Sequence, residues 1–511
     1  MKINKRALPA LLALVLFASA LPAAKRVVRS GSLREPRAID PARSWDDTSA
    51  FYVSNIFDTL VRFDPHTARI VPSLAVSWEA SPDGRSWRFQ LRRGVRFHDG
   101  TPLDADAVVF SFFRQMDPAN PDRHRDFPLF ADIFVFLKTV RKIDPLQVEF
   151  ILSEPFFPFL ATLSVECAAI VSPSAVRKAG AAFAHQPVGT GPFKLSSWHR
   201  NKRLVLKANK EYWRGRPPID EYIDTIEPRG EVLSNSFQQG ALDILNTYSI
   251  SKMVSYKKQD WVTITTTPYL SVTFAVVNSS RPQLSRKGVR QALGYAWDPR
   301  ALKLVFQDYV LPIHTLLPQG LIRNDAPAPA GVFSLEKARA LLKKEGFSGE
   351  LQLEMLLLKD DGLLFQLFSI YARNLKQIGI HLRLTRLETK ALAARIARND
   401  YDLAYSGWIA DYPDPDSMIF PLLSPQLQEQ GLANIAGAKR LDLDQLLKAA
   451  RCEGDAKKRE TLYSDINHAV IADGLIIPLY QDTRVIISHQ KVGRVQPNPL
   501  GKFFLFDLTP P

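Results

Sequence analysis

Three aspartates close together give the strongest chemical signal in the sequence. Asp411, Asp414 and Asp416 stand within six residues of one another, and Pro413 and Pro415 alternate with them. Proline fixes φ and removes a backbone donor, so this loop should be stiff and should hold its carboxylates in place. The pattern predicts a site for a positively charged group.

The residues before the aspartates predict a strand that ends at this loop. The segment 401–406 alternates as a half-buried strand does, and Gly407 and Trp408 form a corner after it. Trp408 and Tyr412 would supply apolar and stacking surface beside Asp411. We expect the rest of the chain to close over this corner.

A second charged residue, Lys359, follows another predicted strand, 350–358. Its ammonium group and the Asp411 carboxylate could hold the two opposite charges of a small zwitterion. A different interpretation is that Lys359, which precedes Asp360 and Asp361, is a solvated lysine in a turn. Both interpretations remain open from the sequence.

Sequence motifs of common catalytic sites are absent. The chain has no nucleophile elbow, zinc-protease motif, phosphate loop or dinucleotide fingerprint, and its 9 histidines are dispersed. His98 and Asp99 are adjacent, and adjacent strand residues point to opposite faces, so we expect a structural role for them. Asp414 and Asp416 could act as paired acids, but their proline-bound loop favours binding. We predict a binding protein, not an enzyme, with no metal or other cofactor.

The second half of the chain alternates between strand and helix patterns. Ligands of parallel α/β sheets lie beyond the carboxyl ends of the strands, where Asp411 and Lys359 stand. The alternation predicts a mainly parallel sheet with helices on its faces. The expected elements are strand 270–277, a helix capped by Ser285, helix 335–344, strand 350–358, helix 363–378, strand 380–384, helix 390–398 and strand 401–406.

The first half predicts shorter elements. The segments 74–79 and 87–91 flank a Pro-Asp-Gly turn and should form a hairpin. A helix is expected over 50–60, and another over 105–115 with Asp104 as its N-cap. The segment 187–192, PVGTGP, has the glycines and prolines of a crossing between domains.

Length and charge limit the class of protein. A chain of 511 residues is too long for one hydrophobic core, so two or three domains are expected. The formal net charge is +14, but Lys and Arg are scattered and no aromatic-interleaved RNA-binding signature is present. We therefore expect no nucleic-acid partner.

Residues 1–24 have the pattern of a signal peptide. A basic start, an apolar run over 7–17 and small residues near Ala23 and Ala24 precede the expected cleavage point. No cysteine stands where a lipid anchor would need one, so the mature protein should be soluble and periplasmic or otherwise extracytoplasmic. Cys167 and Cys452 are expected to be unpaired, buried thiols in different lobes.

Four segments together resemble one protein family. The sequences RFHDGTPLDADAVVFSF, VGTGPFKL, KGVRQALGYAWD and GWIADYPDPDS occur in that order. They resemble signature segments of the bacterial extracellular solute-binding proteins of the dipeptide, oligopeptide and nickel type (family 5), which serve ABC importers. The resemblance runs from about Arg29 to the C-terminus.

This resemblance implies an α/β fold, the two-lobed periplasmic binding protein fold (type II, cluster C-like) with an extra inserted domain in lobe I. A hinge would let the lobes close around a ligand. The implied domains are a signal peptide at 1–24, lobe I at 25–60, 187–267 and 480–511, the inserted domain at 61–186, and lobe II at 268–479.

The resemblance also implies roles for individual residues. Asp411 would take the α-ammonium group of a peptide, and Lys359 would take its carboxylate, although lysine lacks the planar two-bond grip of arginine. Tyr405 occupies a position that is basic in some oligopeptide binders. An early segment would pair with the peptide backbone as an added strand, and its residues are Ser32, Leu33, Arg34 and Glu35.

The implied function is that of a monomeric receptor that captures short peptides and delivers them to the permease and ATPase subunits of an ABC importer. An alternative within the same fold is a receptor for another solute, such as an oligosaccharide, a metal chelate or haem, with Asp411 kept for structure. A secreted hydrolase is a remote alternative from another class.

Overall fold

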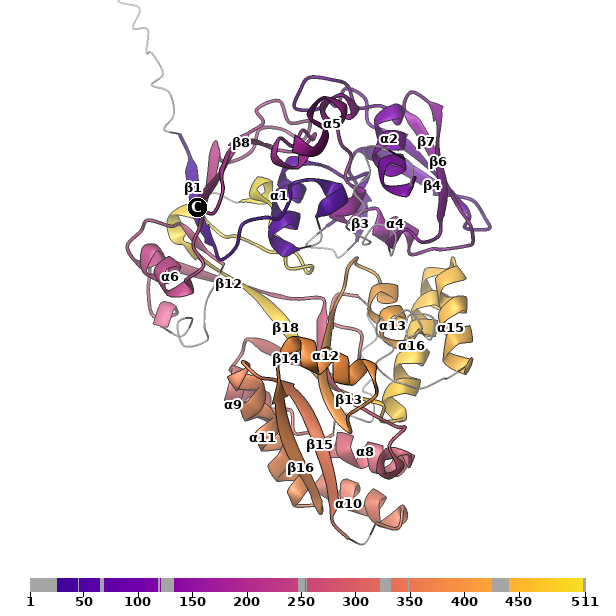
Figure 1. Cartoon of the computed structure of the whole chain (residues 1–511). Helices are drawn as coiled ribbons and strands as arrows, with labels where there is room; N and C mark the ends of the chain where they lie inside the picture. The colour runs from indigo at the N-terminus through magenta and orange to yellow at the C-terminus, as the bar shows by residue number, and fades with distance from the viewer. Residues whose placement is uncertain are drawn as a thin grey trace, which may run out of the picture.

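The protein forms two lobes that meet at a narrow waist, as the computed structural model shows (Figure 1). The structure describes residues 25–44, 46–64, 69–117, 120, 133–246, 253, 255–321, 332–347, 349–424 and 441–508. The predicted signal peptide lies outside these residues. We call the lobe that carries both described chain ends the upper lobe and the other the lower lobe.

One sheet continues through the waist and joins the lobes. Its longest strand, β18 (Ile476–His489), pairs with β13 (Ser271–Val277) in the lower lobe and with β12 (Val262–Pro268) toward the upper lobe. Both the β12–β13 connection and β18 therefore cross between the lobes (Figure 1). Two crossings of this kind are the geometry of a hinge.

The lower lobe confirms the predicted alternation of strands and helices. Strands β16, β15 and β17 are parallel neighbours, but β13 pairs antiparallel with both β17 and β18. The prediction of a mainly parallel sheet is therefore wrong where β13 and β18 join it, because β13 enters from the other lobe and β18 returns to that lobe. The remaining elements are η4 (Pro282–Leu284), α8 (Lys287–Tyr295), α9 (Arg300–Phe306), β14 (Val310–Pro312), α10 (Leu335–Lys344), β15 (Leu351–Leu358), α11 (Gly362–Lys376), β16 (Ile380–Leu387), α12 (Thr389–Ala397), β17 (Leu403–Ile409), α13 (Pro415–Leu423), α15 (Leu441–Cys452) and α16 (Ala456–Ala472).

The upper lobe contains two larger sheets with separate cores and a two-stranded sheet of β2 and β3. The strand order β11-β1-β10-β9-β8 continues the large sheet, and β4-β5-β7-β6 forms a second sheet covered by α2. The elements are β1 (Val27–Ser32), η1 (Pro41–Arg43), α1 (Asp47–Ile56), β2 (Val61–Phe63), β3 (Ile70–Pro72), β4 (Ala75–Ala80), β5 (Ser86–Leu91), α2 (Ala105–Met116), β6 (Leu137–Asp144), β7 (Gln147–Leu152), α4 (Phe159–Thr162), η2 (Glu166–Ala168), α5 (Pro173–Ala179), η3 (Gly180–His185), β8 (Phe193–His199), β9 (Arg203–Ala208), β10 (Glu221–Ile226), α6 (Gly230–Gln238), β11 (Ile244–Leu245), η6 (Gln490–Val492) and η7 (Leu505–Asp507).

Two local expectations for the upper lobe are confirmed, and the helix expected over 50–60 is present as α1, which begins earlier, at Asp47, and ends at Ile56. Strands β4 and β5 form the predicted hairpin, and the Asp104 side chain accepts a hydrogen bond from the Ala107 amide at the start of α2. The segment 187–192 packs against the C-terminal end of α1. A Cβ on Gly191 would lie 2.5 Å from the carbonyl carbon of Ile56, which explains the need for glycine there.

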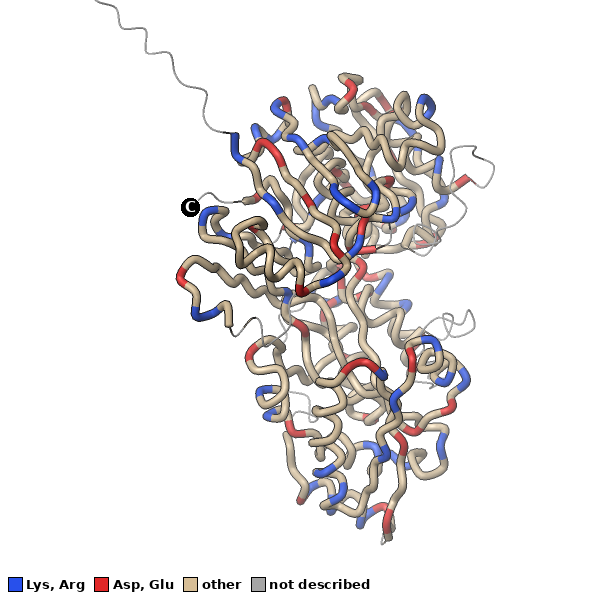
Figure 2. Tube along the Cα trace, turned by 60° about the vertical axis from the view of Figure 1, so that its left-hand side comes forward, with Lys and Arg blue, Asp and Glu red and all other residues tan. Residues whose placement is uncertain are grey.

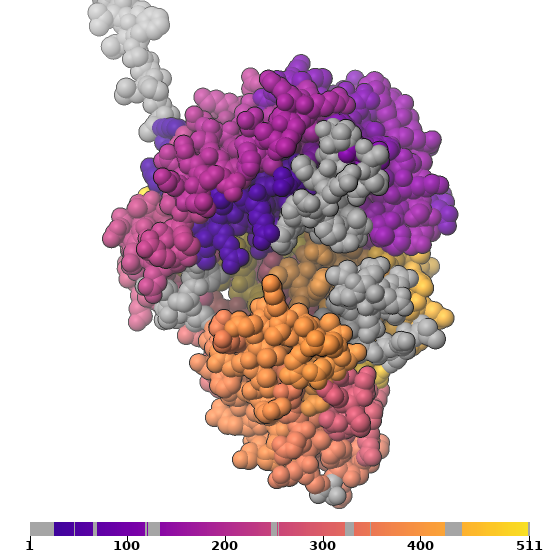
Figure 3. Space-filling view, in the orientation of Figure 1, coloured from indigo at the N-terminus to yellow at the C-terminus, as the bar shows by residue number. Residues whose placement is uncertain are grey.

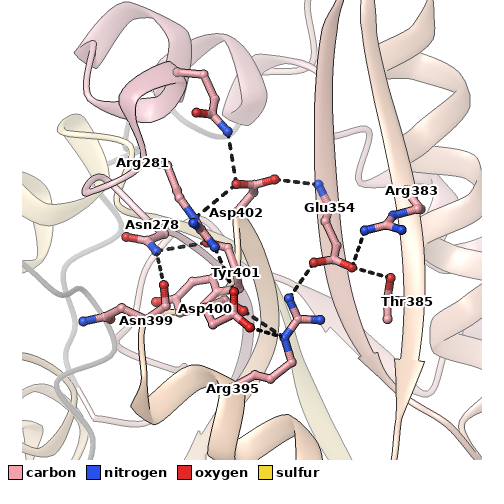
Figure 4. A network of polar contacts seen from close by, with 11 residues as sticks. Asn278, Arg281, Glu354, Arg383, Thr385, Arg395, Asn399, Asp400, Tyr401 and Asp402 are labelled. Atoms are coloured by element: carbon pink, nitrogen blue, oxygen red, sulfur yellow. Dashed lines mark hydrogen bonds and ion pairs between the residues drawn. The ribbon is translucent and has the colours of Figure 1, made fainter.

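A polar network holds the start of β17 (Figure 4). The Asp402 carboxylate accepts a hydrogen bond from the Glu354 amide at 2.9 Å, and Glu354 pairs in turn with Arg395 at 2.7 Å. Asn278 donates to the carbonyl of Tyr401 at 2.9 Å. These contacts tie β17 to β15, α12 and the end of β13, so the strand that leads to the acidic segment has a fixed direction.

Two predictions about helix starts are wrong. Arg286, not Ser285, occupies the N-cap of α8, and the Ser285 hydroxyl donates to the carbonyl of Pro282 instead. The proline-containing segment is not wholly a loop, because Asp414 caps α13 and Pro415 begins it. Proline is favoured at the first helical position, where its missing N–H costs nothing.

Candidate functional site

The corner after β17 is held by one serine. The Ser417 hydroxyl accepts a hydrogen bond from the Asp411 amide at 2.7 Å, and the Ser417 carbonyl accepts one from the Trp408 indole at 2.7 Å. Ala410 donates to the carbonyl of Leu270 in the crossing segment. The backbone at Asp411 is thereby fastened both to α13 and to the waist between the lobes.

Two of the three aspartates are internal structural groups. Asp416 is 0% exposed and accepts hydrogen bonds from the Tyr412 and Tyr463 hydroxyls at 2.8 and 2.9 Å. Its carboxylate also lies 3.1 Å from Nε of Arg451. Asp414 is paired with Arg459 through both of its oxygens. Only Asp411 of this group is exposed.

Asp411 lines a cavity of about 130 Å³ between the lobes. Figure 3 shows the two lobes facing each other across a depression at the waist. The cavity is lined by described residues of both lobes and of the crossing segment, namely Ser44, Asp46, Asp47, Ala50, Ile133, Val165, Glu166, Cys167, Tyr269, Ile409, Ala410, Asp411, Leu500 and Lys502.

Charge in this cavity is mostly negative. Its ammonium group, Lys502, donates to both carboxylate oxygens of Glu166 at 2.6 Å. Burial raises the pKa of the Tyr269 phenol, and the carboxylates of Asp47 and Asp411 raise it further. Asp47 belongs to the upper lobe and Asp411 to the lower lobe, so carboxylates of both lobes act on one ring in the crossing segment.

The aromatic residues predicted for the site have different surroundings. Tyr412 is 8% exposed and packs with the core of the second upper-lobe sheet, so it joins the lobes instead of lining the cavity. Trp408 is half-buried beside the lower-lobe core, and Gly407 is exposed on β17. Burial raises the pKa of Tyr405 to about 12. The roles predicted for these residues in ligand contact stay predictions.

Lys359 directly follows β15, the strand next to β17, as predicted, but it does not line the cavity. The β15–β17 register pairs Leu356 with Ala404, so its continuation places Lys359 level with Gly407. Asp411 follows four residues later, up to about 13 Å further along the chain. The Lys359 ammonium group forms an exposed ion pair with Glu388 at 2.8 Å.

The early segment 32–35 lies at the end of β1 in the upper lobe. The Ser32 hydroxyl donates to the buried carboxylate of Asp224 at 2.7 Å, and Glu35 pairs with Arg200 at 2.9 Å. Leu33 and Arg34 are exposed. The structure does not bring these four residues into the cavity that contains Asp411.

Sequence reasoning missed most of the cavity. Asp47, Glu166, Tyr269 and Lys502 are separated by at least 100 residues from one to the next, and no motif connects them. The only local signal was at Asp46, a helix N-cap that accepts from the Ser49 amide at 2.9 Å. The two-lobed fold alone brings Asp47, Glu166, Tyr269 and Lys502 close to one another.

Other features bear on the class of protein. Among the described residues, no group of three or more His, Cys, Asp and Glu is arranged to hold a metal ion, and no helix is long and apolar enough to cross a membrane. Lys and Arg are interspersed with Asp and Glu over both lobes (Figure 2). Both cysteines are unpaired, but Cys452 is exposed, so the prediction that both are buried is wrong for it.

The fold and the cavity define a two-lobed solute-binding protein, in which paired crossing strands form a hinge and the ligand lies between the lobes. The model of the bacterial extracellular solute-binding proteins, family 5, matches residues 69–430. This chain belongs to that family.

Relatives and solved structures agree with the assignment. The chain is 30% identical over 468 residues to the probable di/tripeptide-binding protein 5 of Pseudomonas aeruginosa, and the match covers 88% of each chain. It is 29% identical over 469 residues to the dipeptide-binding protein of Escherichia coli, covering 88% of this chain and 87% of that one. HbpA2 from Haemophilus parasuis superposes with a TM-score of 0.87 at 24% identity, covering 95% of this chain and 100% of that chain, and so shares the fold.

Proposed function

We propose that this protein is the extracytoplasmic receptor of an ABC importer and that it captures short peptides between its lobes. Asp411 carries the proposal, because it is the exposed carboxylate of the corner after β17 and lines the cavity between the lobes. A carboxylate on a fixed backbone is suited to the α-ammonium group of a peptide. The names of the two peptide-binding relatives support this ligand class.

The free energy at stake follows from the charges. Two unit charges about 4 Å apart interact by about 4 kcal/mol at an effective dielectric constant of about 20, a value typical near a protein surface. Each 1.4 kcal/mol changes a dissociation constant by about tenfold. Removing the charge of Asp411 should therefore weaken the binding of free-amine peptides by roughly 100- to 1,000-fold.

The test is calorimetric titration of the mature protein with di- to pentapeptides and with their N-acetylated forms. Asp411→Asn should keep the circular dichroism spectrum and lose affinity for the free-amine peptides. Asp308→Asn, a change of the same kind at an exposed residue of the lower lobe, should bind as wild type does. Equal affinity of Asp411→Asn and wild type for free-amine peptides would refute the proposed role.

A receptor for another solute within the same fold is the second candidate. It would bind a ligand without an amino terminus, and position 411 would then serve the fold of the corner through the hydrogen bond that its backbone amide donates to the Ser417 hydroxyl. An N-acetylated peptide, a sugar or a chelate that binds wild type and Asp411→Asn equally well would favour this candidate.

A further inference from the structure

The cavity beside Asp411 has more carboxylates than a peptide amino terminus needs. Its charged lining residues are Asp46, Asp47, Glu166, Asp411 and Lys502. Lys502 is occupied by both oxygens of Glu166 at 2.6 Å. Lys502 therefore does not offset the two neighbouring acids of the upper lobe, Asp46 and Asp47.

The two adjacent acids of the upper lobe differ in their surroundings. The Asp46 carboxylate caps α1 and accepts from the amide and hydroxyl of Ser49 at 2.9 and 2.6 Å. Asp47 is exposed in the first turn of that helix and forms no ion pair with any residue in the described part of the chain. Asp47 is thus the carboxylate that is available to a ligand on the side opposite Asp411.

An unsatisfied hydroxyl lies in the same cavity. Ser44 is 4% exposed, lines the cavity, and its Oγ has no hydrogen-bond partner within the described ranges. A buried hydroxyl without a partner is costly, so a polar ligand atom at this position would be stabilising. Ser44 precedes Asp46 by two residues and lines the same cavity, so it is a second, independent polar group beside these acids.

Asp47 adds a negative charge that no ion pair among the described residues offsets. Arg484 lies near enough to Tyr269 to lower the pKa of its phenol, against the effects of Asp47 and Asp411, but Arg484 does not line the cavity. A water-excluding closure would strengthen the repulsion among the carboxylates, because charges interact more strongly at low dielectric. A second positive charge on the ligand would relieve that repulsion.

We propose that this cavity selects peptides that carry a cationic side chain, with Asp411 holding the α-ammonium group and Asp47 and the Ser44 hydroxyl holding the guanidinium or ammonium group of the side chain. This inference rests on the proposed peptide function and adds the ligand class to it. Glu166 and Lys502 pair with each other and form a neutral part of the lining.

The test compares arginine with citrulline, which has nearly the same shape and no charge. Tripeptides of alanine with either residue at position 1, 2 or 3 are titrated into the mature wild-type protein. For at least one position the arginine peptide should bind ten times or more tightly than its citrulline partner. The advantage should shrink at high salt, since exposed charges are screened.

Variants assign the preference to residues. Asp47→Asn should lose most of the arginine advantage and should bind the citrulline peptide as wild type does. Ser44→Ala should reduce the arginine advantage by a smaller factor. Asp308→Asn in the lower lobe should change neither affinity.

Each outcome separates the two claims. Equal binding of arginine and citrulline peptides at every position would overturn the cationic preference and leave the peptide function intact. An arginine advantage that Asp47→Asn retains in full would overturn the role of Asp47. Failure of every peptide in both series to bind would overturn the proposed function, and this inference with it.

Discussion

The buried ion pair between Arg451 and Asp416 should be decisive for the stability of the lower lobe and of its contact with the upper lobe. Arg451 lies with its guanidinium carbon 3.6 Å from the centre of the Phe420 ring and also stacks near Phe136 and Phe156 of the upper lobe. Its carbonyl accepts a hydrogen bond from the Phe157 amide at 3.0 Å. Arg451→Met keeps the apolar stem and removes the charge.

The expected cost comes from the group left behind. Asp416 is fully buried, and without Arg451 its carboxylate would keep the two tyrosine hydroxyls as hydrogen-bond donors and the more distant Arg459, which is already paired with Asp414, as a positive charge. Removal of one member of a buried pair costs about 3–5 kcal/mol. For a domain of about 150–250 residues each kcal/mol lowers Tm by about 2–4 °C, so a loss of roughly 10 °C is expected.

Differential scanning calorimetry of wild type, Arg451→Met and the double variant Asp416→Asn/Arg451→Met provides the assay. The double variant has no uncompensated charge, so it should regain a large part of the loss. A decrease of less than 2 °C in Arg451→Met, or equal decreases in the single and double variants, would refute this reasoning.

Two further predictions concern the upper lobe. Burial lowers the pKa of His98 from 6.5 to about 4, so between these values the unfolded chain binds a proton that the folded chain does not. Stability should fall by up to about 3 kcal/mol as the pH decreases through this window. His98→Gln should show a smaller decrease in Tm from pH 7 to pH 4 than wild type does. Equal decreases in Tm for the two proteins would contradict the assignment of this pH dependence to His98. Gly191→Ala should lose about 1–3 kcal/mol, because its Cβ would overlap the backbone of Ile56. Gly362→Ala, whose Cβ meets open space, is the control, and equal Tm values for both variants would contradict the packing argument.

Periodicity and capping patterns predicted the local elements well. The hairpin around the Pro-Asp-Gly turn, the helix after Asp104 and the successive strands and helices of 335–409 depend on nearby residues, and the structure has them. The start of α13 was missed although Asp414 and Pro415 have the N-cap and first-turn signal, because their proximity to Asp411 favoured a binding loop. The local signal was sufficient there, but it was assigned to another role.

Long-range pairing could not be predicted from the sequence in the same way. The antiparallel edge of the lower sheet depends on β18, which begins in one lobe and ends in the other. The packing of Tyr412 with the second upper-lobe sheet, and the meeting of Asp47 with Asp411 at Tyr269, likewise depend on how the lobes face each other. Single residues that are distant in the chain give no periodic signal.

The most direct test of the central claim is the mass of the ligand that the protein carries. The mature protein is purified without denaturation, then unfolded, and the released small molecules are measured by mass spectrometry for wild type and for Asp411→Asn. We predict short peptides from wild type, enriched in lysine and arginine, and a much lower yield from Asp411→Asn. Release of a sugar, a metal chelate or haem in equal amounts from both proteins would contradict the account.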